Sequence, residues 1–401
     1  MDTLGYANMD FQLQEVAAFV VDAETKGQLE KSLSRFNFNK LEIFKGDVKD
    51  ATRKFKKISS PELLIVDISR SDLPLTDLQN LANVCSPNVR VVVIGNQDNV
   101  GLYRNLLSQG VSEYLVKPLP IDLIYRVLEK IQLAGNVSVS PPKIGKSLGV
   151  YGVCGGVGST SILRNLADLL SVEMHRRIML IDLNLYRGDL GIQLGQVPNS
   201  GLSDLLGSPE RMDGLFIERT AISIGSRLDL LNADESWENA INVSPVAVTE
   251  LTEHLRKRYH FVLCDVMNNP LHSAFKILAS MDVRILLLSP SLASLRNTKR
   301  ILLNLEQEKM EGQTLIVLNH SRPTFKTDLT VKKIEQFIGC SVDFQIPYDG
   351  KNFANSAFYE IPLVRSRGKA GQQIRKLAER LVGQKKSESS RLFWKSITVR
   401  G

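Results

Sequence analysis

The sequence predicts an α/β protein with two domains, each built on a parallel β-sheet that is covered by helices. Short apolar runs of strand length alternate with amphipathic helical stretches along most of the 401 residues, a pattern typical of doubly wound α/β folds. The length also exceeds that of one ordinary domain. The alternation breaks once, in a segment that contains two adjacent prolines, and this break favours a boundary between two separate α/β units.

The break divides the chain into five segments. The first α/β unit is expected at residues 16–131 and the second at residues 148–383. The predicted strands of the first unit are the apolar runs VAAFVV, ELLIVDI, RVVVIG and EYLVK, and those of the second are SLGVYGV, RIMLID, LDLLN, HFVLCDV, VRILLLS, TLIVLN and SVDFQI. Between them, the sequence QLAGNVSVSPPKIGKS at residues 132–147 loses the apolar periodicity and is predicted to be a linker. Residues 1–15 form an N-terminal extension, and residues 384–401 form a basic tail that contains Phe and Trp. We expect a loose tail, with contact to a membrane surface as the alternative.

The overall composition is that of a soluble globular protein, with 43% hydrophobic and 23% charged residues. No apolar run approaches the roughly 18 to 20 residues that span a bilayer, and the N-terminus lacks the layout of a secretory signal. The protein is therefore expected to be cytoplasmic. The four cysteines lack metal-ligand spacing and are interpreted as reduced thiols; they are Cys85, Cys154, Cys264 and Cys340.

The formal net charge of +7 would suit a polyanionic partner. The basic residues are nevertheless spread along the whole chain, and no helix-turn-helix, zinc-finger or RNA-binding motif accompanies them. A solvated basic surface is the favoured interpretation, and no specific nucleic acid is expected as a partner.

A glycine-rich segment between a predicted strand and a predicted helix is the sharpest local motif. We call it the glycine loop; its residues are Gly155, Gly156, Val157, Gly158, Ser159, Thr160 and Ser161. A turn of this kind lets main-chain N–H groups surround phosphate oxygens, and the following helix points the positive end of its dipole at them. Thr160 stands where a P-loop hydroxyl binds Mg²⁺. The strict pattern GxxxxGK[ST] fails twice, because Val153 replaces its first glycine and Ser159 replaces its lysine.

Acidic residues end two of the predicted parallel strands. Asp265 closes the apolar run FVLCD, and Asp182 closes RIMLID, with Asn184, Arg187 and Asp189 in the loop beyond it. The carboxyl ends of parallel strands meet at one edge of the sheet, where ligands of such folds bind. Asp182 and Asp265, together with the hydroxyl of Thr160, are therefore candidate Mg²⁺ ligands, with the carboxylates acting through water.

Residues 147–383 resemble the ParA/MinD family of ATPases. The family has a phosphate loop KGGxGK[ST]T, a DxD strand, a Walker-B strand, a strand that ends in Asn and an Ile-Pro segment. The same order is found here as CGGVGSTS, IDLN, FVLCD, LIVLN and QIPYD. The resemblance implies that the glycine loop binds ATP with Mg²⁺, that Asn319 bonds adenine, and that Pro347 and Tyr348 flank the ring. Without the family order, Asn319 would be interpreted as a turn or cap residue.

Three departures from the family pattern concern hydrolysis. Cys154 stands where the family's signature lysine reaches across a dimer, Ser159 replaces the lysine of the phosphate loop, and Asn184 replaces the second acid of the DxD strand. All three substitutions remove charge that is used in the transition state. The sequence therefore predicts nucleotide binding with slow or absent turnover, and it names no catalytic residue.

Residues 16–131 resemble the receiver domain of response regulators. Asp67 ends the strand LLIVD at the place of the phosphoacceptor, and Lys117 with the following proline matches the family's lysine. A working receiver has two acids after its first strand to hold Mg²⁺, and here Asp22 is followed by Ala23. Gly95 stands where the family has Ser or Thr. The site of Asp22, Asp67 and Lys117 is thus interpreted as vestigial, in a domain that serves as a docking or dimerising surface.

A degenerate receiver followed by a lysine-deficient ParA/MinD domain resembles the arrangement of TadZ/CpaE pilus-assembly proteins, over residues 16–383. The segment SLRNTKRIL at residues 294–302 also resembles that family. The resemblance implies a homodimeric, ATP-binding scaffold at the cell pole or inner face of the inner membrane. Its partners would be tight-adherence (Flp-type) pilus secretion components and a receptor at the pole.

Two other functions remain open from the sequence. One is an active ParA-type ATPase that positions DNA or other cargo through its basic surface. The other is a response regulator controlled by phosphorylation of Asp67.

Overall fold

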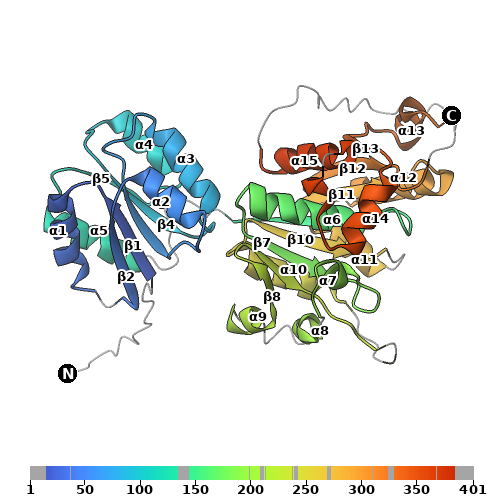
Figure 1. Cartoon of the computed structure of the whole chain (residues 1–401), viewed down its shortest axis with the longest axis horizontal. Helices are drawn as coiled ribbons and strands as arrows, with labels where there is room; N and C mark the ends of the chain where they lie inside the picture. The colour runs from blue at the N-terminus through green and yellow to red at the C-terminus, as the bar shows by residue number, and fades with distance from the viewer. Residues whose placement is uncertain are drawn as a thin grey trace.

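The computed structural model describes residues 15–36, 38–133, 144–197, 199–207, 212, 214–236, 238, 243–268, 272–308, 310–323, 329–366 and 368–383. The predicted fold class is confirmed, since two α/β units follow one another along the chain, each with helices on both faces of a largely parallel sheet (Figure 1). Within the described residues, no helix is long and apolar enough to cross a membrane. The C-terminal tail, and any membrane contact through it, lies outside the described residues.

The first unit has five parallel strands in the order β2-β1-β3-β4-β5, the flavodoxin-like order. The strands are β1 (Glu15–Val20), β2 (Lys40–Lys45), β3 (Leu63–Asp67), β4 (Arg90–Gly95) and β5 (Glu113–Val116). The helices are α1 (Ala23–Leu33), α2 (Val48–Phe55), α3 (Pro74–Val84), α4 (Val100–Ser108) and α5 (Ile121–Leu133). Separate apolar clusters fill the two faces of the sheet.

The pair β2–α2 is absent from the elements that the sequence predicts. β2 lies at the edge of the sheet and carries Lys40, Glu42 and Lys45, with only partial burial between them. An edge strand with charged side chains lacks the apolar run that identifies a buried strand. α2 is short, but Asp47 caps it and Asp50 bonds back to the cap, which stabilises its first turn.

The second unit has eight strands in the order β13-β12-β11-β6-β10-β7-β9-β8. The strands are β6 (Lys146–Gly152), β7 (Ile178–Asp182), β8 (Ile222–Gly225), β9 (Leu228–Leu231), β10 (Phe261–Val266), β11 (Val283–Leu288), β12 (Gln313–Asn319) and β13 (Phe344–Ile346). All neighbours pair in parallel except β8 and β9. The sequence predicts the parallel strands but not β8, because its four residues alternate partly buried and exposed positions without an apolar run.

Helices cover both faces of this sheet. They are α6 (Ser159–Asp168), α7 (Leu190–Gln193), α8 (Gly201–Gly207), α9 (Gly214–Thr220), α10 (Pro245–Arg256), α11 (His272–Ala279), α12 (Leu292–Gln307), α13 (Val331–Ile338), α14 (Gly350–Phe358) and α15 (Lys369–Leu381). One π-helical turn, η1 (Leu169–Glu173), extends α6, and one 3₁₀ turn, η3 (Leu363–Arg365), precedes α15.

The position of β6 in the middle of the sheet explains where a ligand can bind. β6 lies between β10 and β11, so the chain leaves it toward β7 on one side and later returns toward β11 on the other. A crevice forms outside the carboxyl ends of the strands at such a switch point. The glycine loop directly follows β6 and therefore lies at this crevice.

Candidate phosphate-binding and vestigial acidic sites

The glycine loop has the backbone geometry of a phosphate cradle. Gly156 and Gly158 have positive φ angles of 72° and 93°, which glycine adopts without steric cost. Gly158 is the N-cap of α6, and no side chain accepts a bond from the first turn of that helix. The main-chain N–H groups at the start of α6 are thus available to an anion, and the helix dipole favours its negative charge.

Two asparagines from other elements hold the glycine loop in place. The Nδ2 group of Asn319, at the end of β12, donates to the Val157 carbonyl at 2.8 Å. The Nδ2 group of Asn297, on α12, donates to the Val153 carbonyl at 3.0 Å and lies 3.6 Å from the Cys154 Sγ. One bond fixes a main-chain carbonyl within the loop and the other fixes a carbonyl two residues before it, and together they restrain the path of the loop.

The contact of Asn297 with the segment before the glycine loop is not predictable from the sequence. Asn297 belongs to the segment SLRNTKRIL, which resembles the TadZ/CpaE family but whose role has no basis in the sequence alone. Its contact with Val153, just before the glycine loop, spans 144 positions of the chain, and nothing local to residue 297 indicates that contact.

The two strand-end carboxylates lie side by side. β7 and β10 are neighbours in the sheet, and Asp182 and Asp265 are paired in register. Asp265 accepts a hydrogen bond from the Thr160 hydroxyl at 2.6 Å. Asp182 accepts main-chain N–H bonds from Asn184 at 3.1 Å and Leu190 at 3.2 Å. The structure therefore brings together the three candidate Mg²⁺ ligands Thr160, Asp182 and Asp265.

Burial makes this carboxylate pair costly to ionise. Burial raises the pKa of Asp265 to about 7, with a further contribution from the negative charge of Asp182. Burial also raises the pKa of Asp182 to about 6, although its two main-chain hydrogen bonds act in the opposite direction. A divalent cation would compensate both charges. In the described part of the chain no group of three or more His, Cys, Asp and Glu side chains could hold a metal, so a cation here would also need oxygens from a ligand.

The residues assigned to adenine lie beside the middle of the glycine loop, where Asn319 contacts Val157 and approaches Gly158. Asn319 is paired in register with Ile346, and Pro347 and Tyr348 follow directly after it, with Tyr348 exposed. The Oδ1 atom of Asn319 is buried and has no hydrogen-bond partner. An unpaired buried acceptor is unfavourable, and an exocyclic amine of a base could donate to it. These residues fit a nucleotide.

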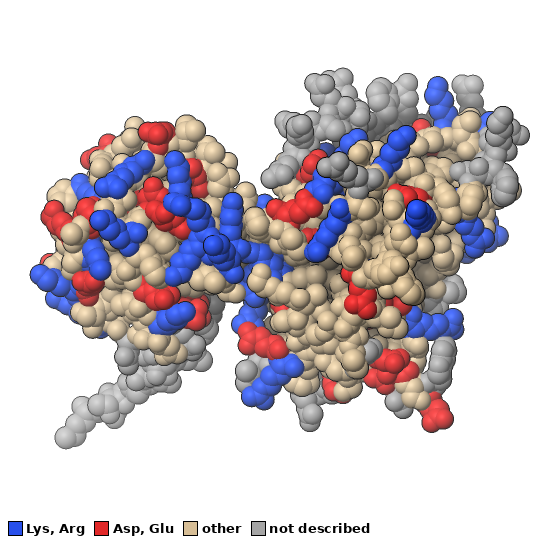
Figure 2. Space-filling view, in the orientation of Figure 1, with Lys and Arg blue, Asp and Glu red and all other residues tan. Residues whose placement is uncertain are grey.

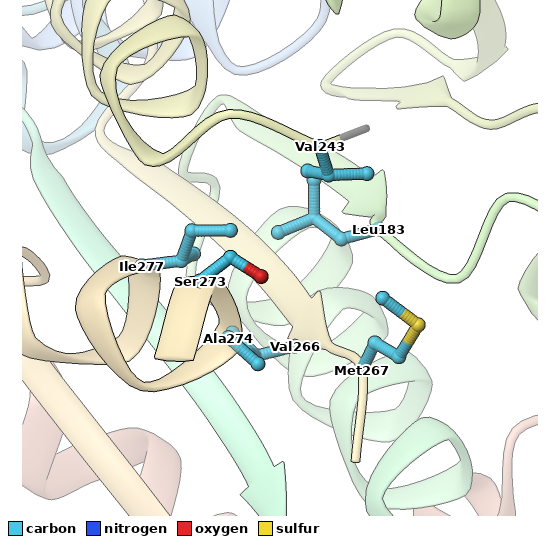
Figure 3. A pocket seen from close by; sticks show the side chains of 7 residues that line it. All are labelled: Leu183, Val243, Val266, Met267, Ser273, Ala274 and Ile277. Carbon is cyan, nitrogen blue, oxygen red and sulfur yellow. The ribbon is translucent and has the colours of Figure 1, made fainter. Parts of the chain in front are cut away.

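A small pocket is lined by residues that follow the ends of β7 and β10. Leu183 and Val266, the residues directly after Asp182 and Asp265, form part of its wall, and the Ser273 hydroxyl is the polar group among the labelled side chains (Figure 3). The other lining residues are Val243, Met267, Ala274 and Ile277.

The vestigial site of the first unit is closed by its own lysine. The Lys117 Nζ atom donates to Asp22 Oδ2 at 2.6 Å and to Asp67 Oδ2 at 2.5 Å. Asp67 is fully buried and also accepts N–H bonds from Val21 at 3.3 Å and Ser69 at 2.9 Å. For Asp22, burial acts to raise the pKa, but the hydrogen bonds from Lys117 and Thr25 outweigh it and lower the pKa to about 2. The carboxylates are compensated without a metal ion.

A tyrosine fills the space beside Gly95. The Tyr114 hydroxyl donates to the Gln97 carbonyl at 2.9 Å, and a Cβ atom built on Gly95 would lie 2.5 Å from that hydroxyl oxygen. A Ser or Thr at position 95 could not fit without displacing the ring. The Tyr114 ring is buried, and it occupies the space that a side chain at position 95 would need.

These features define the second unit as a P-loop protein with the ParA/MinD fold. Its residues 145–380 match the family described as cellulose biosynthesis protein BcsQ. This match covers more than half of the chain, and the chain belongs to that family.

Individual relatives agree with this fold. The septum site-determining protein MinD of Bacillus subtilis is 21% identical over 60% of this chain and 90% of its own. The crystal structure of a ParA family ATPase from Chlorobium tepidum covers 59% of this chain and 98% of its own at 24% identity, with a TM-score of 0.53. MinD from Pyrococcus horikoshii, solved with Mg-ADP, covers 59% and 96% at 23% identity, with a TM-score of 0.52. A separate and shorter similarity, which is no evidence for the fold of the second unit, is to pilus assembly protein CpaE from Caulobacter crescentus, which covers 29% of this chain and 98% of its own at 30% identity, with a TM-score of 0.27.

The raised pKa of Asp265 predicts a pH-dependent effect of Asp265→Asn. Between pH values of about 4 and 7, the folded protein holds a proton that the unfolded chain has lost, so the free energy of unfolding falls as pH rises through this window. The variant lacks this penalty. Relative to wild type, its free energy of unfolding should rise by up to about 4 kcal/mol between about pH 4 and pH 8, measured by urea denaturation. Asp234→Asn, at an exposed carboxylate, is the control and should follow wild type, and a parallel profile for Asp265→Asn would contradict the burial argument.

Lys117→Met should destabilise the receiver-like domain by about 3 kcal/mol, because it leaves the buried Asp67 carboxylate without its cation. The measurement is chemical denaturation of the full chain. Lys130→Met, which removes only an exposed lysine 3.8 Å from Glu113, should cost less than about 1 kcal/mol. The double variant Lys117→Met/Asp67→Asn should recover much of the loss, and a double variant as unstable as Lys117→Met alone would show that the ion bridge is unimportant.

Proposed function

We propose that this protein is an ATP-binding scaffold that localises the tight-adherence pilus secretion machinery at the cell pole and hydrolyses ATP slowly or not at all. One observation carries the proposal. The glycine loop keeps the geometry of a phosphate cradle, while Ser159 and Cys154 occupy the positions of the two lysines that act during hydrolysis in the resembling family.

The chain's own residues have separate roles in this binding site. Main-chain N–H groups of the glycine loop and of the start of α6 receive phosphate oxygens. The Thr160 hydroxyl, with Asp182 and Asp265 beside it, would hold Mg²⁺, and the charge of the ion would compensate the buried carboxylates. The Asn319 Oδ1 atom accepts from the base, with Pro347 and Tyr348 beside it. Bound Mg²⁺ would supply electrostatic stabilisation of phosphate charge.

Slow ATP turnover is expected because positively charged side chains are missing from the two family positions beside the phosphates. Phosphoryl transfer depends on positioned positive charge near the transferred group, because there is little covalent chemistry for the protein to perform. Ser159 and Cys154 supply none, and Asn184 supplies no second carboxylate. Binding through main-chain groups does not depend on these side chains, so affinity should survive the loss of rate.

The receiver-like domain supports a scaffold in place of a phosphorylation switch. Its phosphoacceptor position, Asp67, is fully buried and its carboxylate is already bonded to Lys117. Phosphorylation would require this ion bridge to open, and the missing acid at Ala23 weakens any metal site that could assist it. The domain would therefore act through its surface as a docking element.

The partners of the scaffold are proposed from the TadZ/CpaE resemblance. They are a second copy of the chain, components of the pilus secretion machinery and a receptor at the cell pole, on the cytoplasmic side of the inner membrane. The family to which the chain belongs is described by a name that refers to cellulose biosynthesis. An experiment must therefore distinguish a role in cellulose biosynthesis from the proposed role in pilus assembly.

Calorimetric titration with ATP and Mg²⁺ tests the binding site. Wild type should bind, and Gly156→Val should lose about tenfold or more in affinity, because a β-branched residue is strained at a φ of 72°. Gly155→Ala is the matched control in the same loop, since a Cβ atom there meets nothing within 4 Å. Phosphate release should stay far below the range of about 1 to 1000 s⁻¹ typical of enzymes. Negligible heat for wild type would remove the nucleotide, whereas rapid, DNA-stimulated release would favour a ParA-type ATPase.

Deletion of the gene in its native host tests the cellular role. Surface pili should be lost, and a fluorescent fusion of the protein should form foci at the pole, while cellulose production is unchanged. Complementation with Asp67→Asn should restore pili if phosphorylation is dispensable. Loss of cellulose with normal pili would overturn the proposed partner while leaving nucleotide binding intact.

A further inference from the structure

Three arginines of the second domain contact the first domain where the two units meet (Figure 1). They are Arg176 and Arg177, directly before β7, and Arg227, in the turn between β8 and β9. We call these three residues the arginine clamp. Neither ATP binding nor the vestigial acidic site uses them.

Arg227 binds the ends of two helices at once. Its guanidinium donates to the Val84 carbonyl at 2.9 Å and also to the Phe55 carbonyl. Phe55 and Val84 are the last residues of α2 and α3, where carbonyl groups lack partners within the helix and carry the negative end of its dipole. A third bond, to the His175 carbonyl at 3.1 Å, anchors the side chain within its own domain.

The other two arginines extend this contact along α3. Arg176 donates to the Asn83 carbonyl at 3.0 Å and to Asn83 Oδ1 at 2.6 Å. Arg177 donates to the Ser86 hydroxyl at 3.2 Å and also lies over the Tyr259 ring. All of these acceptors on the first domain are neutral oxygens. The bonds therefore depend on the fork geometry of guanidinium, which an ammonium group cannot reproduce.

The junction between the domains is rich in positive charge, which the C-termini of α2 and α3 can compensate. Figure 2 shows Lys and Arg side chains gathered near the place where the domains meet. Burial lowers the pKa of His260 to about 3, with contributions from Arg176, Arg177 and Arg227, and the pKa of His175 is lowered by burial and by Arg227 and Lys56. Like charges so close would push the domains apart. The negative ends of α2 and α3 supply the compensation.

The clamp and the nucleotide site lie at opposite ends of one strand. Arg177 precedes β7, and Asp182 ends it, so the two are separated by about 16 Å at roughly 3.3 Å per residue. We propose that the arginine clamp fixes the receiver-like domain as a rigid arm at the end of the second sheet opposite the nucleotide site. The partner surface for the clamp is the paired C-termini of α2 and α3.

This placement leaves the nucleotide edge uncovered by the first domain. Two copies that met through that edge would carry their receiver-like arms on the outside, where the remaining faces of each arm stay available to other proteins. This consequence for a dimer rests on the proposed function; the clamp itself does not.

The experiment compares full-length wild type with Arg176→Ala/Arg227→Ala. Small-angle X-ray scattering should show a larger maximum dimension for the variant, and hydrogen exchange in segments 48–57 and 74–86 should accelerate about tenfold or more. Arg300→Ala, at an exposed position of α12, should match wild type in both measurements. ATP binding by all these proteins, read by calorimetry, separates failure of the clamp from failure of the nucleotide site.

Two milder variants keep the test decisive if the double variant folds poorly. Arg227→Lys retains the charge but not the forked donation, and Asn83→Ala removes an acceptor on the first domain without changing the second sheet. Both should shift hydrogen exchange in the same direction as the double variant, by a smaller factor. The proposal that the clamp fixes the receiver-like domain would be overturned if Arg227→Lys and Asn83→Ala matched wild type in both scattering and hydrogen exchange. If the double variant folds, it would have to match wild type as well.

Discussion

Both sites of this molecule depend on how paired carboxylates near strand ends are compensated, since each pair contains at least one buried side chain. In the first domain Asp22 and Asp67 share the ammonium group of Lys117, and the pKa of Asp22 falls to about 2. In the second domain Asp265 accepts a hydrogen bond from the Thr160 hydroxyl and Asp182 accepts two from main-chain N–H groups, all of them neutral donors, and the pKa values of Asp182 and Asp265 rise to about 6 and 7. One pair is satisfied by the protein, and the other needs an external cation.

This difference means that two similar folds carry sites with different ligand requirements. Both are parallel α/β sheets with acids at the carboxyl ends of neighbouring strands. In the receiver-like domain, Lys117 compensates Asp22 and Asp67 without a phosphate or a metal ion. Asp182 and Asp265 lie near the glycine loop, whose main-chain N–H groups are available to an anion. A phosphate ligand with a bound metal ion would therefore compensate the carboxylates and also bind these N–H groups.

The arginine clamp joins these units through the same physical principle. The buried positive charge of Arg227 is tolerated where it meets the negative ends of α2 and α3, just as the buried carboxylate of Asp67 is tolerated where Lys117 meets it. Because the clamp lies at the opposite end of β7 from Asp182, docking of the first domain and binding of a nucleotide do not compete for space.

The sequence by itself determined the two α/β units, their buried strands and the polar residues at the strand ends, because apolar periodicity and glycine spacing are local signals. Its alternation did not reveal β2, α2 or β8, which are short or lie at sheet edges. Only the tertiary structure decided that Asn297 supports the glycine loop, that Lys117 closes the acidic site, and that Arg227 meets α2 and α3. These contacts join residues 50 to 172 positions apart, and their geometry is set by strand order and helix ends, which no local pattern encodes.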